Sequence, residues 1–393
     1  FGCRFPYCRE YIEVNNLKIE DIESIENVYF PIDLNTDFYS IFNEGFFSPT
    51  ILKLLFEKKI KVLILREHEG GGNHIDFFQK LYNFITSNNL SPQLFYLNFA
   101  NKNLYKHYIE SIGDVGLNIN ISDWLLEHTS LVVKRALEIN KVNELGYKFE
   151  LPLLDFEAER KYNFLCLNRV PKAHRIAFLA RIYKNDVIYN TDWSLLFSPS
   201  EFEILYGEGK TFNIEHFSSF FTRNELLNHE PFLKYFFYTK KKSHFEPNSK
   251  GLFNFFGDTK STHYSKTYKN SFISLITETS FHNNEEHISE KSLKPFVNLH
   301  LGIFLAPYNH LQRLKGYGFE TFESLWNEDY DKIYNPMERM EEVSLLVESL
   351  NKTNIIDLYK KAKEILEFNQ NHFLNFWKRE SCSEYFKKLT NGI

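Results

Sequence analysis

Residues 162–175, with the sequence YNFLCLNRVPKAHR, decide the fold class of this chain. The first half is a short, almost continuous apolar run, which is typical of a strand buried on both faces of a parallel sheet. The run ends at Asn168, and the basic segment after it continues as a predicted helix to Lys184. A buried strand that leads through a polar loop into a helix is the repeating unit of an α/β sheet. The stretch therefore predicts layers of parallel strands and helices.

Similar units lie on both sides of this stretch. Upstream, residues 61–65 (KVLIL) predict a strand, residues 74–87 a helix and residues 94–97 (LFYL) the next strand. Downstream, we expect strands at residues 186–189, 272–279, 303–307 and 319–322, and helices at residues 289–294, 311–317 and from 336 onward. The loops at the carboxyl ends of such strands are where open α/β sheets bind ligands.

The length of 393 residues, of which 43% are hydrophobic and 25% charged, is sufficient for two domains. We place a first Rossmann-type lobe at residues 1–155 and a second at 156–335, joined by an irregular acidic linker near 143–159. Residues 191–270 are expected to form helices and long loops inserted in the second lobe. Helices in the region 336–393 are expected to pack across both lobes.

The formal net charge of −5 and the isoelectric point near 6.3 count against a general nucleic-acid binder, which usually carries a basic surface. The one short basic run, at residues 240–242, is interpreted as a solvated loop. No run approaches the ~18 apolar residues of a membrane span, and the first residues lack a signal-peptide pattern. We therefore expect a soluble, cytoplasmic protein.

Cysteine and histidine spacing gives no sign of a metal site. Cys3 and Cys8 could pair or bind a metal, but no second close Cys/His pair has the spacing of a zinc site, so free thiols in a reducing compartment are favoured. Cys166 is interpreted as a core residue. The remaining candidates are histidines scattered in polar segments, namely His244, His263, His282 and His287. We expect no metal and no resident cofactor.

Charged or polar side chains follow three predicted strands of the second lobe, in the segment from Asn168 to Arg175, at Glu278, and at Glu290-Lys291. Because the carboxyl ends of parallel strands meet at one edge, these groups should lie together. A nucleoside diphosphate needs cations and helix N-termini for its phosphates and often a carboxylate for its ribose. Arg175, Lys291 and the predicted helix start can meet the first need. Glu278 or Glu290 can meet the second.

These segments resemble the donor half of the α1,3-fucosyltransferase family, and in particular the fucosyltransferase-like proteins of bacteria and their phages. The similarity covers roughly residues 162–345. Residues 168–175 are similar to the family's strand that leads to a phosphate-binding arginine, here Arg175, and the resemblance includes Asn168 and Arg169 among the donor-binding residues. Thr277-Glu278-Thr279 and Ser289-Glu290-Lys291 resemble the family's strand ending in an acid and its Thr-Glu-Lys signature at a helix start.

The resemblance implies a GT-B fold, in which two Rossmann-type lobes face a cleft, and inverting, metal-independent transfer of a sugar from a nucleotide donor to a hydroxyl acceptor. GDP-fucose is the implied donor, Glu290 would contact its ribose or sugar, and Lys291 its diphosphate. A base from the first lobe would deprotonate the acceptor. The matching loop follows Leu65, where Glu69 is the first choice, Glu67 the second, and His68 could serve instead.

The sequence departs from the family pattern at Thr279, where many members have Asn, and at Leu305-Ala306-Pro307, where the family has a strand followed by Gly. A competing hypothesis is therefore a non-enzymatic structural or interaction protein of a phage that retains a glycosyltransferase-like fold. A third hypothesis is a phage enzyme that glycosylates nucleic-acid bases, against which the acidic net charge counts. We expect a cytoplasmic location, which for a phage protein is the cytoplasm of the infected bacterium.

Overall fold

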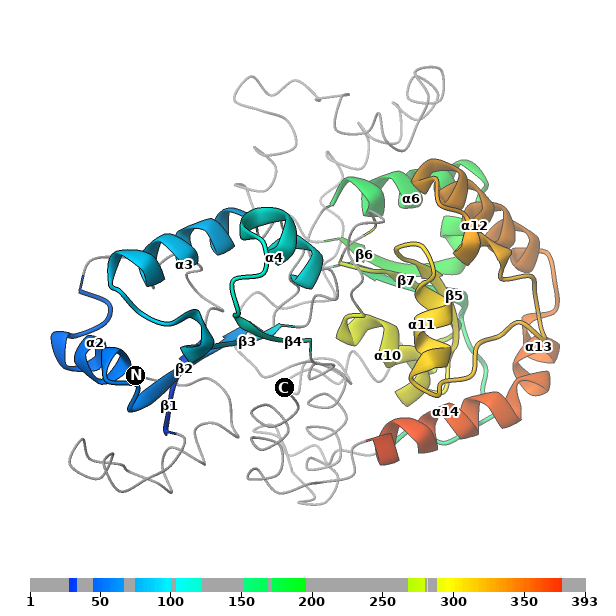
Figure 1. Ribbon diagram of the computed structural model, residues 1–393. Coiled ribbons are helices and arrows are strands. Elements are labelled where there is room, and N and C mark those ends of the chain that lie inside the picture. The colour runs from blue at the N-terminus through cyan, green and yellow to red at the C-terminus, as the bar shows by residue number, and fades with distance from the viewer. Residues whose placement is uncertain are drawn as a thin grey trace. The chain divides into compact units, whose positions relative to one another are not determined.

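The computed structural model describes residues 28–33, 45–66, 75–99, 104–121, 151–168, 172–195, 268–279, 281 and 288–376. These residues form two compact units, the first containing the described residues up to 121 and the second containing those from 151 onward. Both are α/β units with parallel sheets (Figure 1). The fold class predicted from the sequence is thereby confirmed for each unit, while the cleft between two lobes stays a prediction.

The first unit contains a parallel sheet in the order β1-β2-β3-β4, formed by β1 (Val28–Asp33), β2 (Ile60–Arg66), β3 (Phe95–Phe99) and β4 (Asn118–Ile121). The connecting helices are α2 (Pro49–Phe56), α3 (Ile75–Ser87) and α4 (Leu104–Ile112). The chain steps across this sheet in one direction. With the right-handed crossovers that are usual between parallel strands, such an order places successive helices on the same face.

The core of the first unit forms between this face of the sheet and α3. Val62 and Ile64 on β2 and Phe77 and Phe78 on α3 are buried there, and full burial of each such side chain contributes roughly 1.5–3 kcal/mol. The ring of Phe78 lies 5.4 Å from that of Tyr108 on α4. The predicted strand 61–65 and helix 74–87 are confirmed, with ends shifted by a residue.

The second unit contains a parallel sheet in the order β6-β5-β7-β8, formed by β6 (Thr191–Leu195), β5 (Tyr162–Asn168), β7 (Ser271–Thr277) and β8 (Leu301–Leu305). From β5 the chain moves to β6 on one side and later returns to β7 on the other. This reversal creates a topological switch point between β5 and β7. In open α/β sheets the crevice at the carboxyl ends of the strands beside such a point is the usual ligand site.

Helices cover this second sheet and bury its apolar strands. They are α6 (Ala173–Lys184), α10 (Glu290–Val297), α11 (His310–Gly316), α12 (Pro336–Asn351), α13 (Ile355–Lys361) and α14 (Lys363–Phe376). Every residue of β7 and β8 is buried. Met340 and Val343 of α12 and Leu366 and Phe373 of α14 belong to the same core. The described part of the region 336–393 therefore packs into the second unit, and its contact with the first stays a prediction.

Local sequence signals fix the ends of two of these helices as predicted. The hydroxyl of Ser289 accepts the backbone N–H of Lys291 at 3.2 Å and caps α10. After α11 the chain reverses at Gly318, whose φ is +86°. A Cβ at this glycine would lie 2.9 Å from the ring of His372, so both the backbone angle and the space favour glycine.

Two predicted strands are wrong. Residues 187–190 form a 3₁₀ helix, which Asp186 introduces with a left-handed φ of 58°, and β6 begins only at Thr191. Residues 319–322 form a loop that buries Phe319 and Phe322. The backbone N–H of Glu320 donates to the side-chain carbonyl of Asn369 on α14, and the side-chain amide of Asn369 donates to the Glu320 carbonyl, at 2.8 Å each. The Asn369 side chain thus takes the hydrogen bonds that a neighbouring strand would make.

Most of the region 191–270 lies outside the described residues, as do the basic run at 240–242, Cys3, Cys8 and the four scattered histidines. Cys166 is described and is a buried free thiol, as predicted. None of the helices in the described ranges is long and apolar enough to cross a lipid bilayer.

Candidate ligand site at the carboxyl edge of the second sheet

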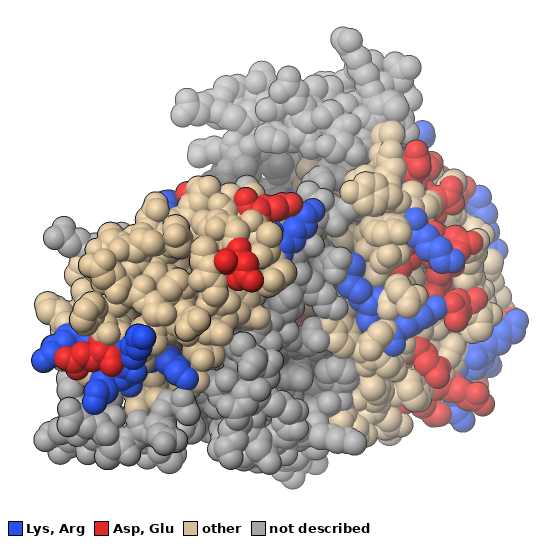
Figure 2. Space-filling model, viewed as in Figure 1, with Lys and Arg blue, Asp and Glu red and all other residues tan. Residues whose placement is uncertain are grey.

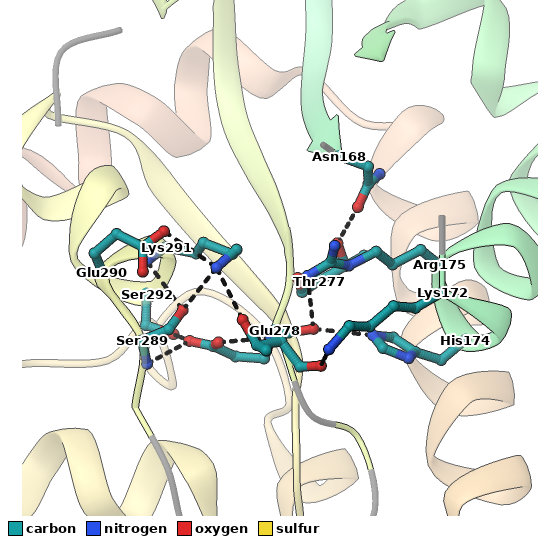
Figure 3. Close-up of polar contacts among 11 residues, drawn as sticks. Asn168, Lys172, His174, Arg175, Thr277, Glu278, Ser289, Glu290, Lys291 and Ser292 are labelled. Carbon is teal, nitrogen blue, oxygen red and sulfur yellow. Dashed lines mark hydrogen bonds and ion pairs between the residues drawn. The ribbon is translucent and has the colours of Figure 1, made fainter. Parts of the chain in front are cut away.

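Three chain segments meet at the carboxyl ends of β5 and β7, beside the switch point. They are residues 172–175 at the start of α6, residues 277–279 at the end of β7, and residues 289–292 at the start of α10. Figure 3 shows Lys172 and Arg175 approaching the end of β7 from one side and Lys291 from the other. The convergence expected from the sequence is therefore present in the second unit.

The basic segment at the start of α6 holds successive carbonyl groups after β7. Lys172 Nζ donates to the Thr279 carbonyl at 2.6 Å, and His174 Nε2 donates to the Glu278 carbonyl at 2.9 Å. Arg175 Nη2 donates to the carbonyls of Thr277 at 3.4 Å and Glu278 at 3.3 Å. Because a carbonyl oxygen can only accept a hydrogen bond, His174 must carry a proton on Nε2. These bonds fix the path of residues 277–279 relative to α6.

Asn168 joins the ends of the strands at the same edge. Its side-chain carbonyl accepts the hydroxyl of Thr277 on β7, and its backbone N–H donates to Ser194 Oγ on β6 at 3.3 Å. Its amide nitrogen donates to Cys166 Sγ at 3.4 Å. Burial raises the pKa of Cys166 to about 12, so this sulfur is a neutral thiol at physiological pH.

The carboxylate of Glu278 connects β7 to the start of α10. One oxygen accepts the Thr279 backbone N–H at 2.9 Å, and the other accepts the Ser289 backbone N–H at 3.1 Å and the hydroxyl of Ser292. Ser292 also contacts His310 Nε2 at 2.8 Å. A negative charge at a helix N-terminus is favourable because the helix dipole is positive there. Glu278, only 1% exposed, is thus used within the protein.

Glu290 and Lys291 stand in the first turn of α10. Lys291 Nζ donates to Thr279 Oγ1 at 2.9 Å and lies 3.1 Å from Glu290 Oε1 and 3.4 Å from Ser289 Oγ. The side chains of Lys291 and Glu290 are 21% and 18% exposed, whereas Arg175 is 2% exposed. Solvent therefore reaches Lys291 and Glu290, which makes them the predicted site residues best placed to meet a ligand.

Sequence reasoning missed three residues that shape this edge. Lys172 and His174 lie inside the quoted stretch, where the basic character of the whole segment was the available signal. Arg339 on α12 is buried, donates to the carbonyls of Phe281 at 2.9 Å and Ile333 at 2.5 Å, and has its guanidinium 4.7 Å from the Phe281 ring centroid. Burial lowers the pKa of Arg339 to about 10, so it stays charged at neutral pH. An arginine in an amphipathic helix carries no signal of such a contact.

The Phe281 ring also stacks against His174, with centroids 5.6 Å apart and an interplanar angle of 19°. Residue 281 therefore lies between side chains of α6 and α12, and both helices help to set the position of the segment that follows β7.

Glu67, His68 and Glu69, the candidate bases, and Arg169, a candidate donor-binding residue, lie outside the described residues. Their roles stay predictions. Within the described ranges no group of three or more His, Cys, Asp or Glu side chains could hold a metal ion.

Lys172, Arg175 and Lys291 bring three positive charges to this edge, against the two carboxylates of Glu278 and Glu290. Because cations exceed carboxylates among these residues, the edge suits an anionic group such as a phosphate. No protein-family model matches this chain, and no curated protein was found to be a relative of it. The interpretation of the site therefore depends on its geometry and on the resemblance described above.

Proposed function

We propose that the chain is an inverting, metal-independent glycosyltransferase that transfers a sugar from a nucleotide donor, with GDP-fucose as the first candidate, to a hydroxyl acceptor. The observation that carries the proposal is the convergence of Lys172, Arg175 and Lys291 on residues 277–279, beside the switch point of a parallel sheet. The donor would bind at this edge.

The degree of burial suggests a division of roles among the site residues. Lys291 would contact the diphosphate and Glu290 the ribose or the sugar, since both are accessible to solvent. Arg175 and Glu278 would position the segment 277–279 and the start of α10 while adding their charges to the local field. Asn168 would hold β5 and β7 in register beneath the donor.

In the proposed reaction the acceptor oxygen forms a bond to the anomeric carbon as the bond from that carbon to the diphosphate oxygen breaks. The bonding electron pair leaves with the diphosphate, where cationic side chains stabilise the growing negative charge. The acceptor proton passes to a base, for which Glu69 is the first candidate and Glu67 or His68 the alternatives. Attack opposite the leaving group inverts the anomeric configuration.

The test is a screen of the purified chain with GDP-fucose, GDP-mannose, UDP-glucose and UDP-galactose, measuring release of nucleoside diphosphate. The melting temperature should also rise with the matching nucleoside diphosphate, because a ligand that binds only the folded state stabilises it. Lys291→Ala should remove both effects without loss of fold. Absence of turnover, together with no change in melting temperature for GDP, UDP, ADP or CDP, would sink the proposal.

The competing hypothesis, a non-enzymatic protein with a glycosyltransferase-like fold, is favoured by the burial of Arg175 and Glu278. Their bonds to the protein explain their charges without a ligand. Lack of any nucleotide response would support this hypothesis.

The third hypothesis, modification of nucleic-acid bases, predicts a basic surface for the phosphate backbone. Figure 2 shows basic and acidic side chains interleaved over the visible face of the second unit. Binding to DNA that weakens steeply with salt would support this hypothesis against the first.

A further inference from the structure

Two ammonium groups from different helical elements contact the same threonine. Lys172, which precedes the first turn of α6, donates from Nζ to the carbonyl oxygen of Thr279 at 2.6 Å. Lys291, in the first turn of α10, donates from Nζ to the hydroxyl oxygen of Thr279 at 2.9 Å. Figure 3 shows the two lysine side chains reaching the segment that follows β7 from opposite sides. The oxygens of one residue therefore determine the spacing of the two charges.

The two acceptor oxygens of Thr279 can be compared with the oxygens of a particular ligand group. The carbonyl and hydroxyl oxygens of a threonine are separated by the same number of covalent bonds as two terminal oxygens on adjacent phosphorus atoms of a diphosphate. Two ammonium groups held close together repel each other. The Glu290 carboxylate, 3.1 Å from Lys291 Nζ, offsets part of this repulsion, and a diphosphate that reached both lysines would offset more of it than Thr279 does. The bonds from both lysines to Thr279 are already charge-assisted through the ammonium groups, and a phosphate oxygen adds the attraction of an opposite charge. A diphosphate therefore satisfies both lysines better than Thr279.

We propose that Lys172 and Lys291 together bind the two phosphates of the nucleotide donor, and that Thr279 yields its contacts with both ammonium groups to the phosphate oxygens. This inference rests on the proposed function and deepens it. Lys172 is the new element, because neither the strand-end motifs nor the family resemblance singled it out. The pair would also favour a nucleoside diphosphate over a monophosphate, since a diphosphate offers terminal oxygens on two phosphorus atoms and carries more negative charge.

The experiment measures the affinity of the purified full chain for GDP, GMP and inorganic pyrophosphate by isothermal titration calorimetry. Lys172→Gln keeps a donor for the Thr279 carbonyl and removes the charge, whereas Lys172→Arg keeps the charge. Lys184→Ala is the matched control, because Lys184 is exposed at the other end of α6, about 18 Å away along the helix axis. Melting temperatures without ligand establish that each variant is folded.

We expect wild type to bind GDP at least 10-fold more tightly than GMP. Lys172→Gln should weaken GDP and pyrophosphate binding about 10- to 100-fold, the usual effect of losing one charge-assisted contact, and should weaken GMP binding less. Lys172→Arg should stay within about threefold of wild type, and Lys184→Ala should not differ from it. Thr279→Val removes one of the competing acceptors and should leave GDP affinity unchanged or raise it.

The inference and the proposed function fail in different ways. If wild type binds GDP and Lys172→Gln binds it equally well, the inference is overturned and the proposed function stands. If wild type binds pyrophosphate in a way that depends on Lys172 but shows no nucleotide binding or turnover, the proposed function fails and the two-lysine site stands. Loss of GDP binding in Thr279→Val would overturn the idea that Thr279 yields to the ligand. If wild type binds none of the three ligands, both are overturned.

Discussion

The carboxylate of Glu278 accepts the backbone N–H of Ser289 at 3.1 Å, which bonds the acid after β7 to the residue that begins α10. The same carboxylate accepts the Thr279 N–H and the Ser292 hydroxyl. A residue that the sequence suggests as a ligand contact therefore holds together the two segments that carry Thr279 and Lys291. Its substitution should first affect the fold of this edge.

Glu278→Ala should lower the free energy of unfolding by about 2–4 kcal/mol, because two backbone N–H groups and a hydroxyl lose a charged acceptor. Urea denaturation followed by tryptophan fluorescence measures the change. Glu323→Ala is the control, since Glu323 is 67% exposed in its contact with Lys315 and should cost less than about 1 kcal/mol. Equal stability of the Glu278 variant and wild type would contradict the structural role.

Arg175→Ala should mainly lower the stability of the protein, whereas Lys291→Ala should mainly remove its response to GDP. The buried guanidinium of Arg175 satisfies two carbonyls, so its loss should cost roughly 2–3 kcal/mol of stability. Lys291 is partly exposed, and its loss should cost about 1 kcal/mol or less while removing the rise in melting temperature with GDP. Differential scanning fluorimetry with and without GDP separates the two effects. A destabilised Lys291→Ala with normal GDP response would contradict this assignment.

Stability should fall as the pH rises toward neutrality because of Glu328. This carboxyl is buried beside the loop 319–326, accepts the Phe322 backbone N–H at 2.9 Å, and has its pKa raised by burial from 4.5 to about 7. Between pH 4.5 and about pH 7, Glu328 is therefore protonated in the folded state and ionised in the unfolded state. The contribution to stability is complete below about pH 4.5, declines up to about pH 7, and amounts to at most ~3 kcal/mol.

Glu328→Gln keeps the acceptor for Phe322 without a titrating group, so it should flatten this part of the pH dependence. Denaturation midpoints at pH 5, 6, 7 and 8 measure the effect. Lys315 and Glu323 also act on Glu328, and Glu323→Gln therefore serves as the control. A pH profile of Glu328→Gln that parallels wild type would show that another group causes the slope.

Asn369→Ala should destabilise the second unit by about 1–3 kcal/mol, because the backbone N–H and C=O of Glu320 would lose their partner. Asn371→Ala, an exposed position on the same helix, is the matched control and should stay within about 0.5 kcal/mol of wild type. The comparison uses urea denaturation midpoints. If the two variants have equal stability, the Asn369 amide does not replace a strand neighbour for this loop.

Local patterns in the sequence determined the fold class and several element ends. The apolar runs at 61–65, 162–168 and 272–279 predict buried parallel strands, and the structure contains β2, β5 and β7 there, with β7 ending at Thr277. Ser289, a helix-capping residue, predicts the start of α10, and Gly318 predicts the end of α11. Periodicity, capping and positive φ are short-range effects, so a few adjacent residues suffice to predict them.

Only the tertiary structure decided the strand order β6-β5-β7-β8, the absence of a strand at 319–322, and the burial of Arg175 and Glu278. Arg175 contacts the carbonyl of Thr277, more than 100 positions away, and Asn369 contacts Glu320 across 49 positions. Such contacts depend on which distant segments pack together, and no local window of sequence contains both partners. The residue types at the site were thus readable in the sequence, while their accessibility and their partners were settled by long-range packing.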